Sequence, residues 1–451
     1  YIVKSTVSTI TQSFSSGSTI FGDSNDDTHR FTGSLSISGS IGIKSDSRNN
    51  LFIGQNAGTG SGIGQSNTAI GIDALTSPRG AESIVAIGRE AGKNITKSAQ
   101  SGVYSVLIGN NANYNNTVGS NNIAIGFYAA GHSSNSMTNT LVIGNFAADA
   151  GPGPTNSTVI GIHAFGNVSG NHPQYVTALG GYALYGSAGT TTGINGAVAI
   201  GHKSLYSITS AAGSVAIGYE ASYNLTSGAN QVSIGYQAGK ALTTAANSTF
   251  IGYQAGLVHT GGNNVAIGDR AFYDTDAGGS SLASTQNVAI GNRALAGTFT
   301  DAAVVGTVAL GYYALGNATM GGIDYNIAIG MESQQENAGG QNIAIGYATM
   351  KIADGGETGN VAIGTSVMDV LNNDDSDHNV AIGNYSLRGG TTQLARNIAI
   401  GHQSMGETRQ NNIGGLDNVF IGHQAGGGVW VTAGSNYNIG IGSYALDAAL
   451  N

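Results

Sequence analysis

The 451-residue chain contains no cysteine, only 4 prolines and a single tryptophan. Without cysteine it forms no disulfide, offers no thiol nucleophile and holds no thiolate-ligated zinc. The few prolines, together with the absence of a Gly-X-Y period, exclude a collagen-like triple helix. No stretch approaches the roughly 18 consecutive apolar residues that predict a membrane-spanning helix.

Charged residues are also scarce. Asp, Glu, Lys and Arg together make up 9% of the chain, against about 25% in an ordinary soluble domain. The 16 basic residues are outnumbered by 25 acidic ones, which gives a formal net charge of −9. Because such a chain has no basic footprint, we expect neither nucleic acid nor an anionic membrane as a partner.

Glycine and small apolar residues dominate what is present. Gly supplies 73 of the 451 residues, more than twice the usual share of about 7%, and 40% of the chain is hydrophobic. This hydrophobic content excludes the charged, core-poor composition of a disordered chain. The composition predicts backbones that pack closely against one another.

A short repeat runs through most of the chain. Each copy has a large aliphatic or β-branched residue, a small residue, Ile or Leu, and then Gly, as in Val265-Ala266-Ile267-Gly268. Two variable residues follow, and then Ala or Ser. Counted by its glycine, which we call the anchor glycine, the repeat occurs 22 times between Gly54 and Gly442, at intervals of 16 to 23 residues. Such a period is the signature of a repeat architecture.

The repeat also predicts how its residues point. The larger residues stand at i and i+2, which is the period of a β-strand. Val and Ile favour a pleated, buried surface, so we expect Val265 and Ile267 to face the core. Ala266 then points the other way, where another backbone has to cover it closely. A slender coil cannot provide that cover by itself, so we predict a parallel homotrimer.

The anchor glycines are predicted to be turn residues. Glycine adopts a bend or a positive φ without a Cβ clash, and we expect a side chain at Gly268 to be damaging. The structural turn glycines that we single out are Gly88, Gly126, Gly218, Gly235, Gly252, Gly268, Gly291, Gly346, Gly383, Gly401 and Gly422.

The repeat is too short for a helix pair or a propeller blade. It predicts an all-β fold, a parallel β-solenoid of about 22 coils, each with an inner strand, a turn at Gly, a looser outer strand and a polar loop. Asn residues directly before the strands, such as Asn264 and Asn379, fit a turn or a stacked side-chain ladder. We predict that residues 51–451 form this repeat shaft or head, and that residues 1–50 form a β-rich lead-in or attachment segment.

The core phrase of the repeat, Asn-Val/Ile-Ala-Ile-Gly-x-x-Ala/Ser, resembles the head repeat of trimeric autotransporter adhesins. Those heads are left-handed parallel β-rolls in which three chains pack by their inner strands. The variants Phe250–Gly256 and Phe420–Gly426 look like repeats in long fibre proteins of tailed phages. The resemblance therefore implies a homotrimeric, non-enzymatic fibre.

The first 50 residues differ in kind. The segments Ser18–Ser24 and Asp26–Leu35 resemble the lead-in of structural proteins from marine phages. We recognise neither coiled-coil heptads nor a C-terminal β-barrel anchor, which an autotransporter would need, and this favours a phage fibre. Since the sequence starts at Tyr1 rather than at Met, we expect processing or missing residues at the N-terminus.

Residues that could carry chemistry are few. His202, His402 and His423 each follow an anchor glycine, in a position often filled by Tyr, and this interchange predicts a stacking position. The acidic segment 372–378 could ligate Ca²⁺, but it lacks the spacing of an EF-hand loop. We expect no cofactor, no metal and no catalytic residue.

Binding is predicted for the longest intervals, because insertions in repeat proteins map to loops that contact partners. The interval from Gly268 to Gly291 is the longest, at 23 residues. Loops of this kind can hydrogen-bond a glycan and stack on its apolar face. The candidate binding residues are Tyr273, Asp274, Asp276, Glu407, Arg409, Asp374, Asp375 and Asp377.

These observations predict an extracellular fibre of a phage virion that attaches to a host glycan or receptor and contacts other virion proteins through its N-terminal segment. A bacterial surface adhesin head is the first alternative. A tailspike-like polysaccharide-degrading enzyme is the second, although it needs paired carboxylates in a groove, and the acidic residues here mostly stand alone in turns. An ice-binding solenoid is the third, but the Thr residues keep no register with the anchor glycines.

Overall fold

The computed structural model describes most of the chain from residue 47 to residue 447. The described ranges are 47–59, 64–76, 80–95, 104–116, 119–132, 137–170, 172–186, 191, 193–273, 284–297, 303–317, 323–336, 339–353, 356–371, 375–388, 393–406, 415–428 and 435–447. All of them belong to one compact unit, Ser45–Asn451. Residues 1–46, most of the expected lead-in segment, lie outside the described residues.

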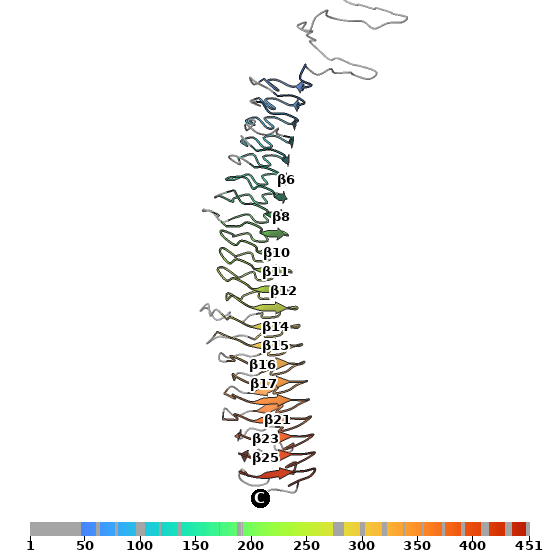
Figure 1. Cartoon of the computed structure of the whole chain (residues 1–451), viewed down its shortest axis with the longest axis vertical. Helices are drawn as coiled ribbons and strands as arrows, with labels where there is room; N and C mark the ends of the chain where they lie inside the picture. The colour runs from blue at the N-terminus through green and yellow to red at the C-terminus, as the bar shows by residue number, and fades with distance from the viewer. Residues whose placement is uncertain are drawn as a thin grey trace, which may run out of the picture. The chain divides into compact units, whose positions relative to one another are not determined.

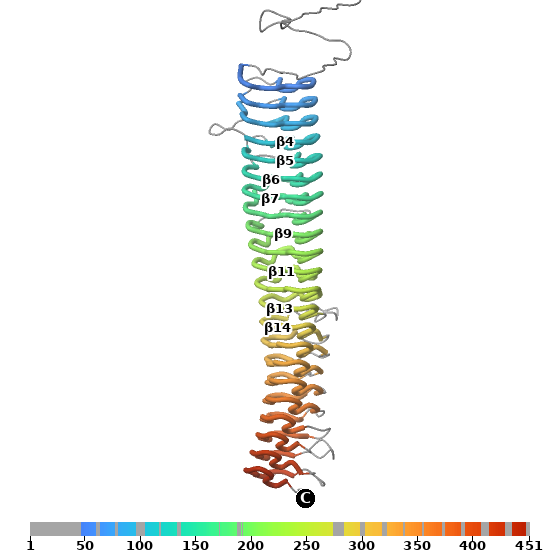
Figure 2. The backbone as a smooth tube through the Cα atoms, turned by 90° about the vertical axis from the view of Figure 1, so that its right-hand side faces the viewer, coloured from blue at the N-terminus to red at the C-terminus, as the bar shows by residue number. Residues whose placement is uncertain are grey.

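The unit is a parallel β-solenoid, as the repeat predicts. One strand of each coil joins a single 22-stranded sheet, and the described residues contain no helix. Figures 1 and 2 show the coils of this unit stacked in one column. The strands are β1 (Leu51–Ile53), β2 (Thr68–Ile70), β3 (Val85–Ile87), β4 (Val106–Ile108), β5 (Ile123–Ile125), β6 (Leu141–Ile143), β7 (Thr158–Ile160), β8 (Thr177–Leu179), β9 (Val198–Ile200), β10 (Val215–Ile217), β11 (Val232–Ile234), β12 (Thr249–Ile251), β13 (Val265–Ile267), β14 (Val288–Ile290), β15 (Val308–Leu310), β16 (Ile327–Ile329), β17 (Ile343–Ile345), β18 (Ile352–Ala353), β19 (Val361–Ile363), β20 (Val370–Leu371), β21 (Val380–Ile382), β22 (Leu394–Ala395), β23 (Ile398–Ile400), β24 (Gly415–Leu416), β25 (Val419–Ile421) and β26 (Ile439–Ile441).

Equivalent residues of successive repeats lie directly above one another. In the pairing of β13 with β14, for example, Val265, Ala266 and Ile267 face Val288, Ala289 and Ile290. This register is kept although the sequence interval varies, because the loops absorb the extra residues. Each column of equivalent positions therefore forms a ladder along the solenoid.

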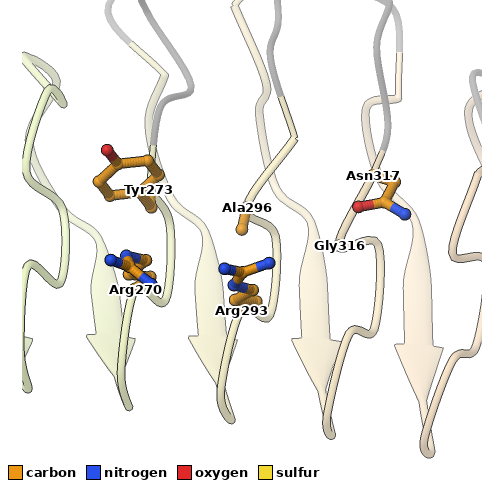
Figure 3. Close-up of a pocket in the computed structure, with 6 residues that line it drawn as sticks. All are labelled: Arg270, Tyr273, Arg293, Ala296, Gly316 and Asn317. Carbon is orange, nitrogen blue, oxygen red and sulfur yellow. The ribbon is translucent and has the colours of Figure 1, made fainter.

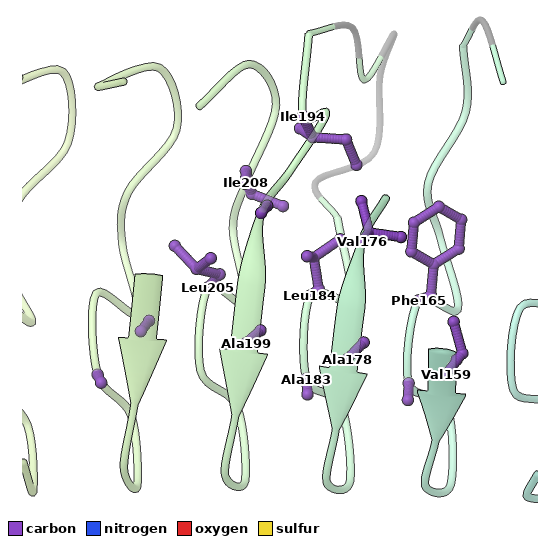
Figure 4. Packing of buried hydrophobic residues seen from close by; sticks show 14 of the residues in the cluster. Val159, Phe165, Val176, Ala178, Ala183, Leu184, Ile194, Ala199, Leu205 and Ile208 are labelled. Atoms are coloured by element: carbon purple, nitrogen blue, oxygen red, sulfur yellow. The ribbon is translucent and has the colours of Figure 1, made fainter. Parts of the chain in front are cut away.

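The orientation of the strand residues corrects the sequence-based expectation. The middle residue, usually Ala, points into the coil and is fully buried, as Ala199, Ala216 and Ala266 are. Val265 and Ile267 on either side of it point outward and remain half-exposed. Figure 4 shows why: Ala178 and Ala199 share a narrow interior with residues such as Leu184 and Leu205, which leaves room for only a small side chain at these two strand positions.

The segment after each anchor glycine is also different from the expected outer strand. Residues with φ near +50° occupy its second and fourth positions, and most of them are not glycine, as at Glu220 (52°) and Ser222 (47°). The Glu220 N–H donates to the carbonyl of His202 in the preceding coil, and the Ser222 N–H donates to Ala238 in the next coil. These turns thus form a hydrogen-bonded ladder without being a strand. Among the described residues, β18 with β20 and β22 with β24 form short two-stranded sheets outside the main one.

Buried asparagines form a second ladder just before the strands. The Oδ1 atom of Asn379 accepts a hydrogen bond from the Asn397 N–H at 3.0 Å, and the Asn379 Nδ2 atom donates to the carbonyl of Leu394 at 2.6 Å. The same arrangement joins Asn360 to Asn379 and Asn397 to Asn418. Each amide thereby satisfies backbone groups that would otherwise be buried without a partner.

We expect Asn379→Leu to destabilise the solenoid. It leaves the N–H of Asn397 and the carbonyl of Leu394 unpaired in the interior, which costs about 2–3 kcal/mol in unfolding free energy after the added apolar burial is counted. The matched control is Asn292→Leu, because the exposed Asn292 side chain bonds only to Asp269 of the preceding coil, at 3.3 Å. Urea unfolding followed by circular dichroism measures both, and equal midpoints would contradict a structural role for the ladder.

Candidate interaction surfaces

The outer face of the 22-stranded sheet is an apolar stripe, which we call the strand face. It consists of the first and third residues of each strand. The third residue is Ile or Leu throughout, and the first is Val, Ile, Leu or Thr, so neither column contains a charge. Twenty-two strands at about 4.8 Å give it a length of about 100 Å. Contiguous apolar patches beyond a few hundred Å² mark interaction sites on soluble proteins.

Several side chains of the strand face are exposed in the isolated chain. Ile123 is 41% exposed and Leu310 is 40% exposed. Nothing in the described part of the chain covers this face, since the strand partners lie above and below within the sheet. The strand face is therefore a continuous, uncharged apolar surface that a partner chain could cover.

Aromatic rings form a ladder in the first position after the anchor glycines. The ring centroids of Tyr219, Tyr236 and Tyr253 follow one another at 5.3 Å, with ring planes within 10° of parallel. His202 stacks on Tyr219 at 5.4 Å, and His402 stacks on His423 at 5.5 Å. The rings therefore cover one another's faces and present their edges to solvent. Along this ladder a sugar cannot stack flat on a ring.

A second set of aromatic and charged side chains lies in the second and fifth positions after the anchor glycines, which we call the return columns. Tyr206 stacks on Tyr185 at 5.1 Å and on Tyr223 at 5.0 Å. The Lys203 ammonium lies 5.8 Å from the ring of Tyr206. Partial burial, with a smaller effect of the neighbouring tyrosines, raises the pKa of Tyr206. These columns thus hold charge and aromatic surface side by side.

Ion pairs join successive coils within the return columns. The Lys240 Nζ atom lies 2.8 Å from Glu220 of the preceding coil. Partial burial opposes ionisation of this carboxyl, but hydrogen bonds from Lys240 and Gln237 outweigh it and hold the pKa of Glu220 below its usual value. Lys351 pairs with Glu332 in the same way, at 2.7 Å.

A cavity of about 320 Å³ opens on the return columns next to β13 and β14 (Figure 3). It is lined by Arg270, Tyr273, Arg293, Ala296, Gly316 and Asn317, which come from three successive coils. Arg270 and Arg293 occupy the same position of consecutive repeats and lie side by side in Figure 3. Alignment of the repeats by their anchor glycines places the two arginines in one column, but the predicted binding residues came from the loops and did not include this pair.

The predicted binding residues are partly within the described ranges. Tyr273 lines the cavity. Asp377 accepts hydrogen bonds from the backbone N–H and the hydroxyl of Thr358 in the preceding coil, at 2.7 and 3.4 Å, which is a structural role in a turn. Asp375 is exposed nearby. Asp274, Asp276, Glu407, Arg409 and Asp374 lie outside the described residues.

The described residues contain no group of three or more His, Asp or Glu side chains placed to hold a metal ion. They also contain no helix that is long and apolar enough to cross a membrane.

The anchor glycines have φ between +124° and +143°. Neither a protein-family model nor a curated protein matches this sequence.

Proposed function

We propose that this chain is the shaft of a homotrimeric, non-enzymatic fibre of a phage virion, which presents its loops to a host-surface glycan or receptor. The observation that carries the proposal is the strand face, a half-exposed apolar stripe repeated without a charge over 22 strands. The resemblance of the core phrase to three-chain β-rolls and to phage fibre repeats supports the same arrangement.

Association by the strand face follows from its register. In a parallel trimer, each rung of Val and Ile meets the equivalent rungs of two partners around a common axis. Covering the exposed half of such side chains contributes about 1 kcal/mol each from apolar burial. The contribution is small for one rung and large for the whole stripe, because all 22 strands present the same pair of positions. We expect the trimer to be the folded unit.

Host attachment is tested on the loops that vary in length. In the full chain, the intervals Gly88–Gly109, Gly180–Gly201, Gly268–Gly291 and Gly401–Gly422 are shortened to the 17-residue interval found at Gly218–Gly235. We expect a trimer that binds host cells at least tenfold more weakly, because the fibre displays each weak loop contact three times. Undiminished binding by a folded variant would show that these loops carry no receptor site.

The competing functions give different outcomes. A bacterial surface adhesin head would have the same trimer and the same strand face, but would be found on cells and not on purified virions. A polysaccharide-degrading enzyme would release reducing ends from host glycan. Incubation of the trimer with extracted host polysaccharide is expected to release none, and steady release would replace this proposal with the enzymatic one.

A further inference from the structure

The return columns hold seven described cations, and four of them pair with a carboxylate of the described residues. Lys93, Lys240, Lys351 and Arg388 each have a carboxylate oxygen within 3.0 Å. Lys203 lies over the rings of two tyrosines. Arg270 and Arg293 stand in consecutive coils at the cavity, and no carboxylate of the described residues lies within 4 Å of either.

The two guanidinium groups are held in place while most of their donors stay available. Arg270 donates from Nε to Gln254 at 3.3 Å and lies 5.4 Å from the ring of Tyr253. Arg293 donates to the hydroxyl of Tyr313 and lies 5.3 Å from that ring. A guanidinium has five N–H donors, and each of these two uses one of them in a hydrogen bond to another described residue. The remaining donors border the cavity.

Two adjacent cations repel each other, so an anion placed between them gains from both. Arginine's planar fork matches the two oxygens of a carboxylate or a sulfate. The rest of the lining is suited to a sugar, because the Tyr273 hydroxyl and the exposed Asn317 amide can bond to hydroxyl groups. The cavity, at about 320 Å³, lies within the size range of small-ligand pockets.

We propose that Arg270 and Arg293 form a binding site for the oxyanion of an acidic saccharide, a carboxylate or a sulfate carried on a sugar ring. The inference rests on the proposed function, since it names the class of host polymer that the fibre takes. The overall charge of −9 disfavours a polyanion elsewhere on the chain, so recognition is local to this cavity. Each site binds weakly, and threefold display supplies the avidity.

The test uses the full chain and isothermal titration at 50 mM NaCl with four probes: trigalacturonate, a sulfated galactose trisaccharide, neutral maltotriose and inorganic sulfate. At least one charged trisaccharide is expected to bind at least tenfold more tightly than maltotriose and than sulfate alone. The preferred probe then identifies whether the oxyanion is a carboxylate or a sulfate. Equal affinity for maltotriose, or for sulfate alone, would overturn the proposal.

Three variants locate the site. Arg270→Gln combined with Arg293→Gln is expected to lose at least tenfold in affinity for the preferred probe, while Lys203→Gln, a cation of the same column outside the cavity, stays within twofold. Arg293→Lys, which keeps the charge and loses the planar fork, is expected to lie between them. An unchanged affinity in the double variant would overturn the proposal, and circular dichroism verifies that each variant is folded.

The saccharide-binding test can fail without contradicting the fibre proposal, and the fibre proposal can fail without contradicting the saccharide site. A trimer that attaches to host cells but binds no charged trisaccharide would refute the saccharide site and leave the fibre intact. A chain that binds trigalacturonate as a monomer would refute the trimeric fibre and leave the site in place.

Discussion

Gly268→Ala is expected to lower the unfolding free energy by about 2–5 kcal/mol per chain. A Cβ atom at this position would lie 2.5 Å from the carbonyl oxygen of Gly291 in the next coil. The backbone there is close-packed in register and cannot move aside without separating two coils. The φ of +135° adds about 1–3 kcal/mol of strain for any residue other than glycine.

The matched control is Gly196→Ala. Gly196 also has a positive φ, +71°, but a Cβ atom there meets nothing within 4 Å. Loss of glycine's freedom in the unfolded chain is the same in both variants and cancels in the comparison. We expect the control to cost about 1 kcal/mol. Equal urea midpoints for the two variants would show that contact between successive anchor glycines does not constrain the coil spacing.

The second large effect is expected on the strand face. Ile251→Asp combined with Ile267→Asp is expected to leave the fold of an isolated chain nearly unaffected, because both side chains point out of the solenoid and are half-exposed. In a trimer packed by the strand face, the same pair places six carboxylates in an apolar interior. Burying unpaired charges costs several kcal/mol each unless they are neutralised. We expect the variant to remain folded and to dissociate at concentrations where the native chain is trimeric.

The control places the same number of charges outside the strand face, in one of these coils and the coil before it. Gln237→Asp combined with Gln254→Asp lies in the return columns, at φ values of +54° and +53° that Asp tolerates. We expect this variant to keep the native mass. Sedimentation velocity distinguishes the two, and a trimeric strand-face variant would exclude the strand face as the interface.

The sequence was sufficient to predict the coil, because both the strand period and the anchor glycine are local properties of each repeat. The sequence led to a wrong prediction of which side of each strand points into the coil. In a strand such as Val265–Ile267, the larger residues look like core, and only the narrow lumen of the finished coil explains why Ala266 is the residue that fits. The outward Val and Ile suit a partner chain rather than the core of their own coil.

The turns and the cavity were harder to predict for a different reason. Residues such as Glu220 and Ser222 adopt a positive φ because hydrogen bonds to the coils on either side hold them there, and nothing in their chemistry marks them in the sequence. Arg270 and Arg293 are 23 residues apart and come together only because the register is kept across the longest interval. Tyr273 was predicted as a binding residue because it is the first of the extra loop residues in that same interval.

The most direct test of the central claim, association of parallel copies by the strand face, is the mass of the native chain in solution. Multi-angle light scattering at micromolar concentration is expected to give about 136 kDa, three times the 45.2 kDa of one chain. The same species should unfold in one concentration-dependent transition, because folding and association are coupled. A folded 45.2 kDa monomer at that concentration would contradict the account.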